Sequence, residues 1–151
     1  MTTPPAPAGA PVPPPIVTGR APDGTDVAAL VETVRTVILA AMAGDEAAIA
    51  RHFAPDAELV FVGRRLAAAS EIGAFNAGRY RRVAKIIEAW DVAFGETRTV
   101  VTSVGTLHGE WLDGTPFEGN RYIDRFVLVD GRIVRMDVWN DSAERMLSRG
   151  A

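Results

Sequence analysis

The stretch Asn120-Arg-Tyr-Ile-Asp-Arg-Phe-Val-Leu-Val-Asp-Gly-Arg-Ile-Val-Arg-Met-Asp-Val-Trp-Asn-Asp-Ser-Ala-Glu144 decides the fold. It predicts two long strands joined by a tight turn at Asp130-Gly131. An Asp-Gly pair between β-branched and aromatic runs is a strong hairpin signal, because both turn residues must tolerate positive φ. A helix begins after the second strand, where Asp141 and Glu144 match a capping box.

Asp124 is the most informative residue of this stretch. Alternate residues of a strand share a face, so Asp124 is in phase with Tyr122, Phe126 and Leu128. A carboxyl group among aromatic and aliphatic neighbours loses hydration, which favours its neutral form. Asp124 is therefore the first catalytic candidate. The alternative is a surface ion pair with a neighbouring arginine.

Helical patterns precede this stretch. Asp26 or Thr25 can cap a helix that ends at Gly44, and Asp45 can cap a second helix closed by Ala54-Pro55. Ser70 is the expected cap of a third helix. A short strand is expected at 59–62 and further strands at 83–94, 99–111, 117–129 and 132–140. Three N-terminal helices on a curved, mainly antiparallel sheet define an α+β fold.

The bulk composition limits the kinds of function. The chain has 151 residues, a net charge of −3 and no cysteine. We expect no nucleic-acid partner, no membrane span, no metal and no cofactor, and a cytoplasmic location. The prolines of residues 1–24 predict that this segment is a disordered tail, and we expect a single domain at 25–151. Lys85 is the only lysine, which we attribute to codon usage.

Three passages resemble the nuclear transport factor 2-like (NTF2-like) superfamily, which includes ketosteroid isomerase and the SnoaL-like polyketide cyclases. These passages are residues 43–58, the hairpin Asp130-Gly-Arg-Ile133 and the ending Trp139-Asn-Asp141. The resemblance implies a cone-shaped fold with an apolar pocket between helices and sheet, commonly in a homodimer.

The resemblance also suggests a role for Asp124. The segment Ile123-Asp-Arg-Phe126 resembles the part of ketosteroid isomerase where that enzyme keeps a protonated aspartic acid as a hydrogen-bond donor. The other positions depart from the pattern. The family's general base falls near Val60 or Phe61, and its oxyanion-hole tyrosine falls at Val37.

His108 is the remaining candidate for a general base. The turn at Asp113-Gly114 places Ser103 opposite Asp124 and His108 on the other face of the sheet. A one-residue bulge near Gly109 would bring His108 inward. The alternative is a histidine at the surface or at an interface.

Several other residues are candidates for the pocket wall. Tyr122 and Phe126 share the face of Asp124. Asn140 is expected either to orient a substrate carbonyl or to bind backbone at the strand end. Trp90, placed on a face with Ile86 and Val92, can line the pocket or fill the core. Trp111 and Trp139 are expected to face outward, toward a dimer partner.

Two functions follow from these patterns. The first is a cofactor-free isomerase, cyclase or dehydratase that acts on a small apolar carbonyl compound, with Asp124 and His108 as its catalytic pair. The second is a non-catalytic module of the same fold that binds a small ligand or dimerises. The in-phase carboxyl of Asp124 favours the enzyme, because an apolar core does not need it.

Overall fold

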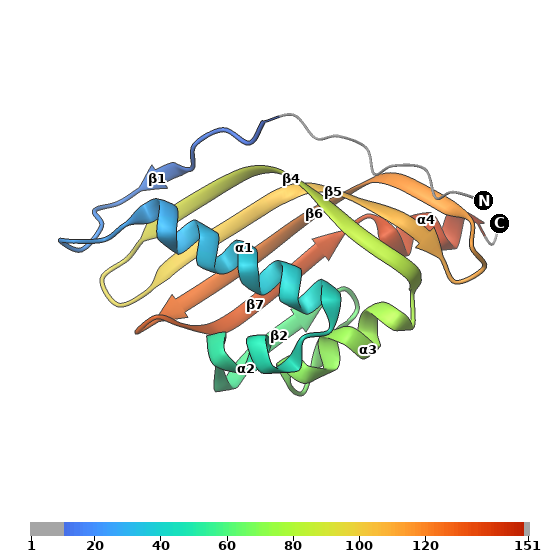
Figure 1. Cartoon of the computed structure of the whole chain (residues 1–151), viewed down its shortest axis with the longest axis horizontal. Coiled ribbons are helices and arrows are strands. Elements are labelled where there is room, and N and C mark those ends of the chain that lie inside the picture. The colour runs from blue at the N-terminus through green and yellow to red at the C-terminus, as the bar shows by residue number, and fades with distance from the viewer. Residues whose placement is uncertain (1–10, 150–151) are drawn as a thin grey trace.

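The computed structural model describes residues 11–149, which form one mixed sheet with helices against it (Figure 1). This confirms the α+β class. The elements in chain order are β1 (Ile16–Thr18), α1 (Val27–Ala43), α2 (Glu46–His52), β2 (Phe53–Phe61), β3 (Arg64–Leu66), a 3-10 turn (Ala69–Glu71), α3 (Ile72–Ala77), β4 (Tyr80–Phe94), β5 (Thr99–Trp111), β6 (Pro116–Val129), β7 (Arg132–Asn140) and α4 (Ser142–Arg149).

The first two helices begin where the sequence predicts. The Asp26 carboxylate accepts a hydrogen bond from the Ala29 N–H, and Asp45 does the same for Ala48. Gly44 ends α1 in the left-handed conformation, with φ of 70°. These caps satisfy backbone groups that the helix ends leave free.

The third helix and the first strand differ from the prediction. Ser70 lies inside the 3-10 turn and caps nothing, and α3 begins at Ile72 without a side-chain cap. Strand β2 already begins at Phe53 and therefore includes Ala54-Pro55. Proline is tolerated there because this part of β2 makes few ladder pairs with β7.

The seven strands are ordered β1-β4-β5-β6-β7-β2-β3. Strands β4 to β7 are an antiparallel meander, and β2 runs parallel to β7. The hairpin at Asp130-Gly131 forms as predicted, with φ of 50° and 77° at its two residues. In Figure 1, α1, α2 and α3 lie on the same side of this curved sheet, and α4 follows the end of β7.

The expected disorder of residues 1–24 does not extend to β1. Ile16–Thr18 pairs in parallel with Asp91–Ala93 at the edge of the sheet. These three residues contain no proline, so their N–H groups are free to join the ladder. The prediction for residues 1–10 lies outside the described residues.

A hydrophobic core fills the space between the helices and the inner face of the sheet. Val34, Val37 and Ile38 of α1 pack there with Phe126 of β6, and all four are almost fully buried. Within residues 11–149, no helix combines the length and apolarity that crossing a bilayer requires.

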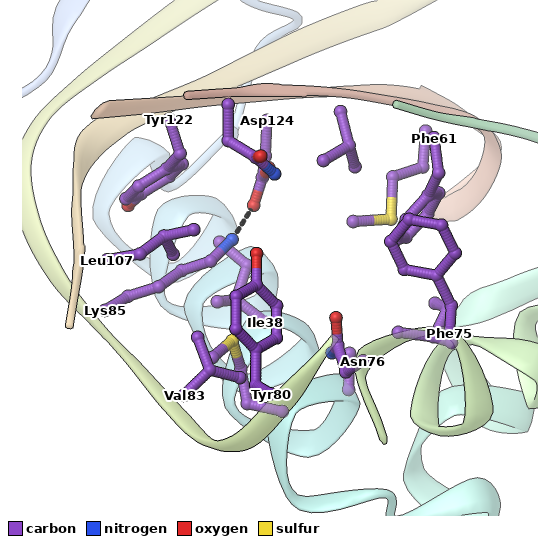
Figure 2. Close-up of a pocket in the computed structure, with 16 residues that line it drawn as sticks. Ile38, Phe61, Phe75, Asn76, Tyr80, Val83, Lys85, Leu107, Tyr122 and Asp124 are labelled. Carbon is purple, nitrogen blue, oxygen red and sulfur yellow. Dashed lines mark hydrogen bonds and ion pairs between the residues drawn. The ribbon is translucent and has the colours of Figure 1, made fainter. Parts of the chain in front are cut away.

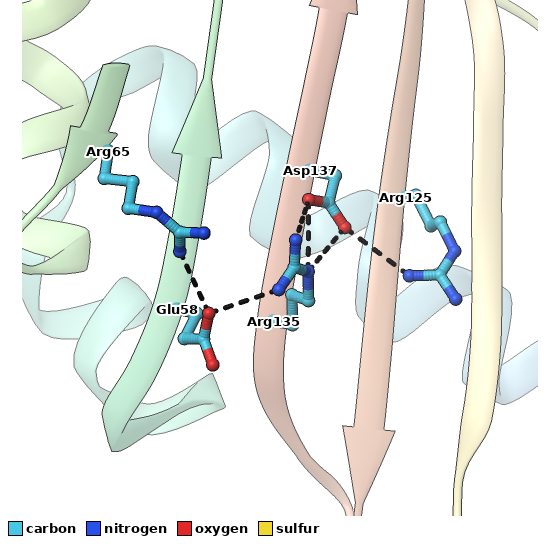
Figure 3. A network of polar contacts seen from close by, with 5 residues as sticks. All are labelled: Glu58, Arg65, Arg125, Arg135 and Asp137. Atoms are coloured by element: carbon cyan, nitrogen blue, oxygen red, sulfur yellow. Dashed lines mark hydrogen bonds and ion pairs between the residues drawn. The ribbon is translucent and has the colours of Figure 1, made fainter.

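The outer face of the sheet carries a row of alternating charges (Figure 3). Glu58 binds Arg65 and Arg135, and Asp137 binds Arg135 and Arg125, at distances between 2.9 and 3.4 Å. The row crosses β3, β2, β7 and β6. Beside it, Ile123 and Trp139 pair across β6 and β7 and are 44% and 54% exposed.

Candidate active site

A pocket opens between the helices and the inner face of the sheet (Figure 2). Its enclosed cavity has a volume of about 40 Å³, and all empty space out to and including the opening amounts to about 500 Å³. Most of its wall is apolar. The lining residues are Ile38, Ala41, Met42, Phe61, Ile72, Phe75, Asn76, Tyr80, Val83, Lys85, Leu107, Tyr122, Asp124, Met136, Val138 and Asn140.

An ion pair lies inside this pocket. The Lys85 ammonium of β4 contacts the Oδ2 atom of Asp124 of β6 (Figure 2). Asp124 is fully buried, and the Lys85 side chain is 11% exposed. Taking both charges out of water costs free energy that their attraction offsets only in part. Apolar residues would fill this space at a lower cost, so the pair points to function.

The second carboxylate oxygen of Asp124 has no partner. Oδ1 is buried, and no hydrogen-bond donor of the described residues reaches it. Buried oxygens of this kind are nearly always hydrogen-bonded in folded proteins. A carboxylate oxygen left free at the wall of a pocket is able to accept a proton or a hydrogen bond from a bound molecule.

Tyr122 supports the ion pair from the side. The Lys85 ammonium lies 4.1 Å from the centre of its ring, a cation–π distance. Its hydroxyl shares a 2.8 Å hydrogen bond with Ser103, which is fully buried on β5. Burial raises the pKa of Tyr122, and the nearby charge of Asp124 adds to the rise, although the Ser103 bond opposes it.

Two further polar side chains line the pocket. Asn140 fulfils the second expectation made for it, because its Oδ1 accepts a hydrogen bond from the backbone N–H of Ser142. It also belongs to the lining. The Tyr80 hydroxyl points into the pocket (Figure 2). Burial raises the pKa of Tyr80, an effect that Ser142 and the charge of Arg79 partly oppose.

Asn140, and not Asp141, accepts a hydrogen bond from the N–H of Ser142, the first residue of α4. The carboxylate of Asp141 does not cap α4. It binds the backbone N–H and the guanidinium of Arg121, at 2.9 to 3.3 Å. The capping box is therefore absent, since a charged arginine on the neighbouring strand binds a carboxylate more strongly than a free N–H does.

His108 does not join Asp124. It is buried, it pairs with Ala84 of β4, and it is not part of the pocket lining. A bulge does occur at this position, but on the partner strand. Leu107 pairs with Asn120 and Gly109 with Phe117, so β6 supplies two residues opposite His108. The direction of β5 side chains is unchanged, and His108 stays on the other face.

Two of the three aromatic candidates for the pocket wall, Phe126 and Trp90, lie in the core instead, and only Tyr122 lines the pocket. Phe126 is completely buried and Trp90 nearly so, and both belong to the main core. Trp111 was expected to face outward, and this is wrong. It is in phase with Leu107 and packs against Tyr80 and Phe117, at ring distances of 5.7 and 4.4 Å. Trp139 does face outward.

Lys85 is the site residue that the sequence prediction missed. Strand β4 has a bulge at Glu88, because Ile87 pairs with Gly105 while Ala89 pairs with Val104. The extra residue puts Lys85 on the same face as Trp90, although counting by two places them on opposite faces. A lone lysine within an apolar strand was the available signal.

Solved structures with the same fold include several relatives of low sequence identity. A candidate SnoaL-like polyketide cyclase from Jannaschia is 19% identical, with a TM-score of 0.64 over 88% of this chain and 99% of that one. A candidate ketosteroid isomerase from Shewanella frigidimarina is 16% identical, with a TM-score of 0.60 over 74% and 94%. An NTF2-like protein of unknown function from Burkholderia pseudomallei is 19% identical, with a TM-score of 0.62 over 78% and 95%.

These similarities define the class of the fold. The protein has an NTF2-like fold, shared with SnoaL-like and ketosteroid isomerase-like proteins. No protein-family model matches the sequence, and no curated protein matches it either. Since one fold of this kind carries many functions, function has to be argued from the pocket itself.

Proposed function

We propose that this protein is a cofactor-free acid–base enzyme of the SnoaL-like and ketosteroid isomerase-like type, acting on a small, mostly apolar carbonyl compound. The observation that carries the proposal is the Lys85–Asp124 ion pair inside an otherwise apolar pocket. Neighbours of the same fold include candidate isomerases and cyclases, which supports the family of reactions.

Asp124 acts as the base in this proposal, not as the neutral acid that the sequence suggested. A lysine ammonium in contact with a carboxylate favours the ionised form. Oδ2 is held by Lys85, while Oδ1 is free to take a proton from the carbon next to the substrate carbonyl.

Lys85 stabilises the charge that this step creates. Its ammonium has three N–H donors, and Asp124 uses one side of it. The electron pair of the broken C–H bond moves onto the carbonyl oxygen, and the Lys85 ammonium binds the resulting enolate oxygen. Return of the proton from Asp124 to the same carbon gives exchange with solvent, and return to a conjugated carbon gives isomerisation.

A ligand-binding module without chemistry is the second candidate. The position that carries the general base in ketosteroid isomerase falls near Val60 or Phe61 here, and Phe61 is an apolar part of the pocket wall. His108 does not line the pocket. A binder would use the same cavity and would need no proton transfer.

Deuterium exchange separates the two candidates. The α-protons of 2-tetralone in deuterated buffer are followed by NMR with the wild-type protein, Asp124→Asn and Lys85→Met. The control is Asp91→Asn, which removes an exposed carboxylate from the outer side of β4. We expect the wild type and the control to catalyse exchange, and Asp124→Asn to lose about 100-fold or more.

Two results would count against the enzyme. If 2-tetralone binds to the wild type but exchanges no faster than in buffer, the protein is a binding module for such compounds. If Asp124→Asn exchanges as fast as the control, the pocket carboxylate is not the base.

A further inference from the structure

The enclosed part of the pocket has room for only a few atoms of a ligand. Its volume of about 40 Å³ accommodates about three water-sized groups. A carbonyl oxygen, the carbonyl carbon and the carbon that loses a proton fill this space. The Lys85 ammonium and the Oδ1 atom of Asp124, which no donor of the described residues reaches, lie at its wall. The other atoms of a larger carbonyl compound therefore lie outside the enclosed part.

A groove on the surface adjoins the pocket. It has a volume of about 360 Å³ and lies between the end of α1, α3 and the start of β4. Four residues line both the pocket and the groove: Met42, Asn76, Tyr80 and Val83. In Figure 2, the last three of them lie across the pocket from Asp124. A ligand that extends from the ion pair toward this wall therefore reaches the groove.

The wall of the groove differs in character from that of the pocket. It carries more polar than apolar surface, whereas the pocket is mostly apolar. The side chain of Asn76, at the boundary, offers both donors and an acceptor. Four lining residues have no side-chain atom beyond Cβ, which leaves the groove open: Ala43, Gly44, Gly73 and Ala77. The part of a ligand that lies here is therefore expected to form hydrogen bonds.

The groove offers little charge for binding an ion. Arg81 and Arg82 line it, but their guanidinium nitrogens lie 3.8 and 3.5 Å from the carboxylate of Glu110. Their side chains are 68% and 46% exposed, so solvent screens the one positive charge that remains. The wall therefore selects for hydrogen-bonding groups more than for charge.

We infer that the substrate is an elongated carbonyl compound with an apolar carbonyl end and an uncharged, hydrogen-bonding tail. The carbonyl end lies in the enclosed cavity, at Lys85 and Asp124. The tail passes Met42 and Asn76 and lies in the groove between α1 and α3. The side chain of Met42 is unbranched and flexible, so it can move aside for the tail. The inference rests on the proposed function only for the position of the carbonyl group.

Three ligands with the same carbonyl end test the tail. Calorimetry compares 2-tetralone with 6-(2-hydroxyethoxy)-2-tetralone and 6-propoxy-2-tetralone. The two tails are equally long, and only the first ends in a hydroxyl group. Both extend from the end of the ring system that is farthest from the carbonyl group. We expect the wild type to bind the hydroxyethoxy compound about tenfold more tightly than 2-tetralone, as one or two hydrogen bonds imply, and the propoxy compound with less than about a threefold gain.

Two variants fill the groove, one from each helix. Ala43→Phe and Ala77→Phe change exposed residues that line the groove but not the pocket. We expect each to remove most of the tenfold gain and to change 2-tetralone affinity by less than about twofold, as surface substitutions do. The control is Ala50→Phe, which adds the same ring to an exposed alanine of α2 that lines neither space and should keep the gain. With two variants on different helices, the test holds even if one of them does not fold.

Four outcomes overturn the inference: the wild type gains nothing from the hydroxyethoxy tail, the propoxy tail gives the same gain, the gain survives in both groove variants, or Ala50→Phe loses it equally. These are binding measurements and do not depend on proton exchange. If the tail is bound in the groove but no protons of 2-tetralone exchange, the groove stands and the acid–base proposal fails. If Asp124-dependent exchange occurs but the tail gives no gain, the acid–base proposal stands and the groove fails.

Discussion

Lys85 and Asp124 stabilise each other only as a pair. Substituting Lys85 by Met leaves a fully buried carboxylate without its cation. We expect Lys85→Met to lower the free energy of unfolding at pH 7 by about 3–5 kcal/mol, the usual cost of breaking a buried ion pair from one side. Urea denaturation followed by circular dichroism measures this.

The double variant Lys85→Met/Asp124→Leu is the matched control. It replaces both charges with apolar groups of similar size, so most of the lost stability should return. A double variant that is as unstable as Lys85→Met, or less stable still, would mean that the pair contributes packing rather than charge compensation.

The chain has two tyrosines, so a titration of phenolate absorbance reports on these two hydroxyl groups alone. Both Tyr80 and Tyr122 have a pKa raised chiefly by burial. A tyrosine has an ordinary pKa of about 10 in the unfolded chain. We therefore expect phenolate absorbance of the folded protein to appear only above that pH, with Tyr122 last, while the protein in urea titrates near 10.

The sign of the stability effect follows from these shifts. A raised pKa means that the folded state holds its proton longer than the unfolded state does. The stability from neutral Tyr80 and Tyr122 is complete below pH of about 10 and is lost as the pH rises toward the folded pKa. A folded-state titration that overlaps the one in urea would contradict the burial of both hydroxyls.

At the scale of elements, regular strands were predictable and irregular ones were not. Between Asn120 and Val127, β6 pairs without a shift on either side, so counting by two correctly put Tyr122 and Asp124 on the inner face. Asn140 lies in the pocket wall for the same reason. Strand β4 has bulges near Arg81 and Glu88. Beyond each bulge, the side chains lie on the face opposite to the one that strict alternation predicts.

The sequence of β4 alone does not reveal these bulges, because they depend on which residues of the neighbouring strand lie opposite them. At the β4 bulge near Glu88, the neighbour on β5 is Gly105. A Cβ atom there would lie 2.0 Å from the Ile86 carbonyl oxygen and 3.0 Å from the Tyr122 ring. The close approach of β4 to β5, and with it the inward direction of Lys85, needs a residue without a side chain.

Gly105→Ala tests this dependence. We expect the methyl group to push β4 away from β5 and to lower stability by about 1–3 kcal/mol, as overpacking does. It should also lower the rate of 2-tetralone exchange, because Lys85 moves relative to Asp124. The control is Gly73→Ala in α3, where an added Cβ meets only Gly44 at 3.8 Å. Equal stability of the two variants would contradict the close approach.

At the scale of the whole molecule, the outer face of the sheet suits a second copy of the chain. Ile123 and Trp139 are adjacent, exposed and apolar, and a row of alternating charges lies beside them (Figure 3). Aromatic side chains are enriched at such interfaces. We therefore expect a homodimer through this face, as the family resemblance also suggests.

Light scattering after size exclusion measures the expected dimer. Ile123→Lys/Trp139→Glu should give a monomer with an intact fold, because charges then replace the apolar centre of the interface. The control is Leu147→Glu, which changes a residue of α4 that is 73% exposed. A wild-type protein that is monomeric at all concentrations, or a control that dissociates equally, would contradict this interface.

The bulge at Glu88 has a consequence for evolution. One codon inserted into β4, or deleted from it, turns the side chains on one side of the change to the opposite face of the sheet. A different set of residues then faces the cavity, while the core on the other side of the change stays the same. Chains of common descent can therefore keep the same pocket while its cation moves from one alignment column to the next. A search for relatives that share this chemistry should compare side-chain direction in space, since aligned columns would report the lysine as lost.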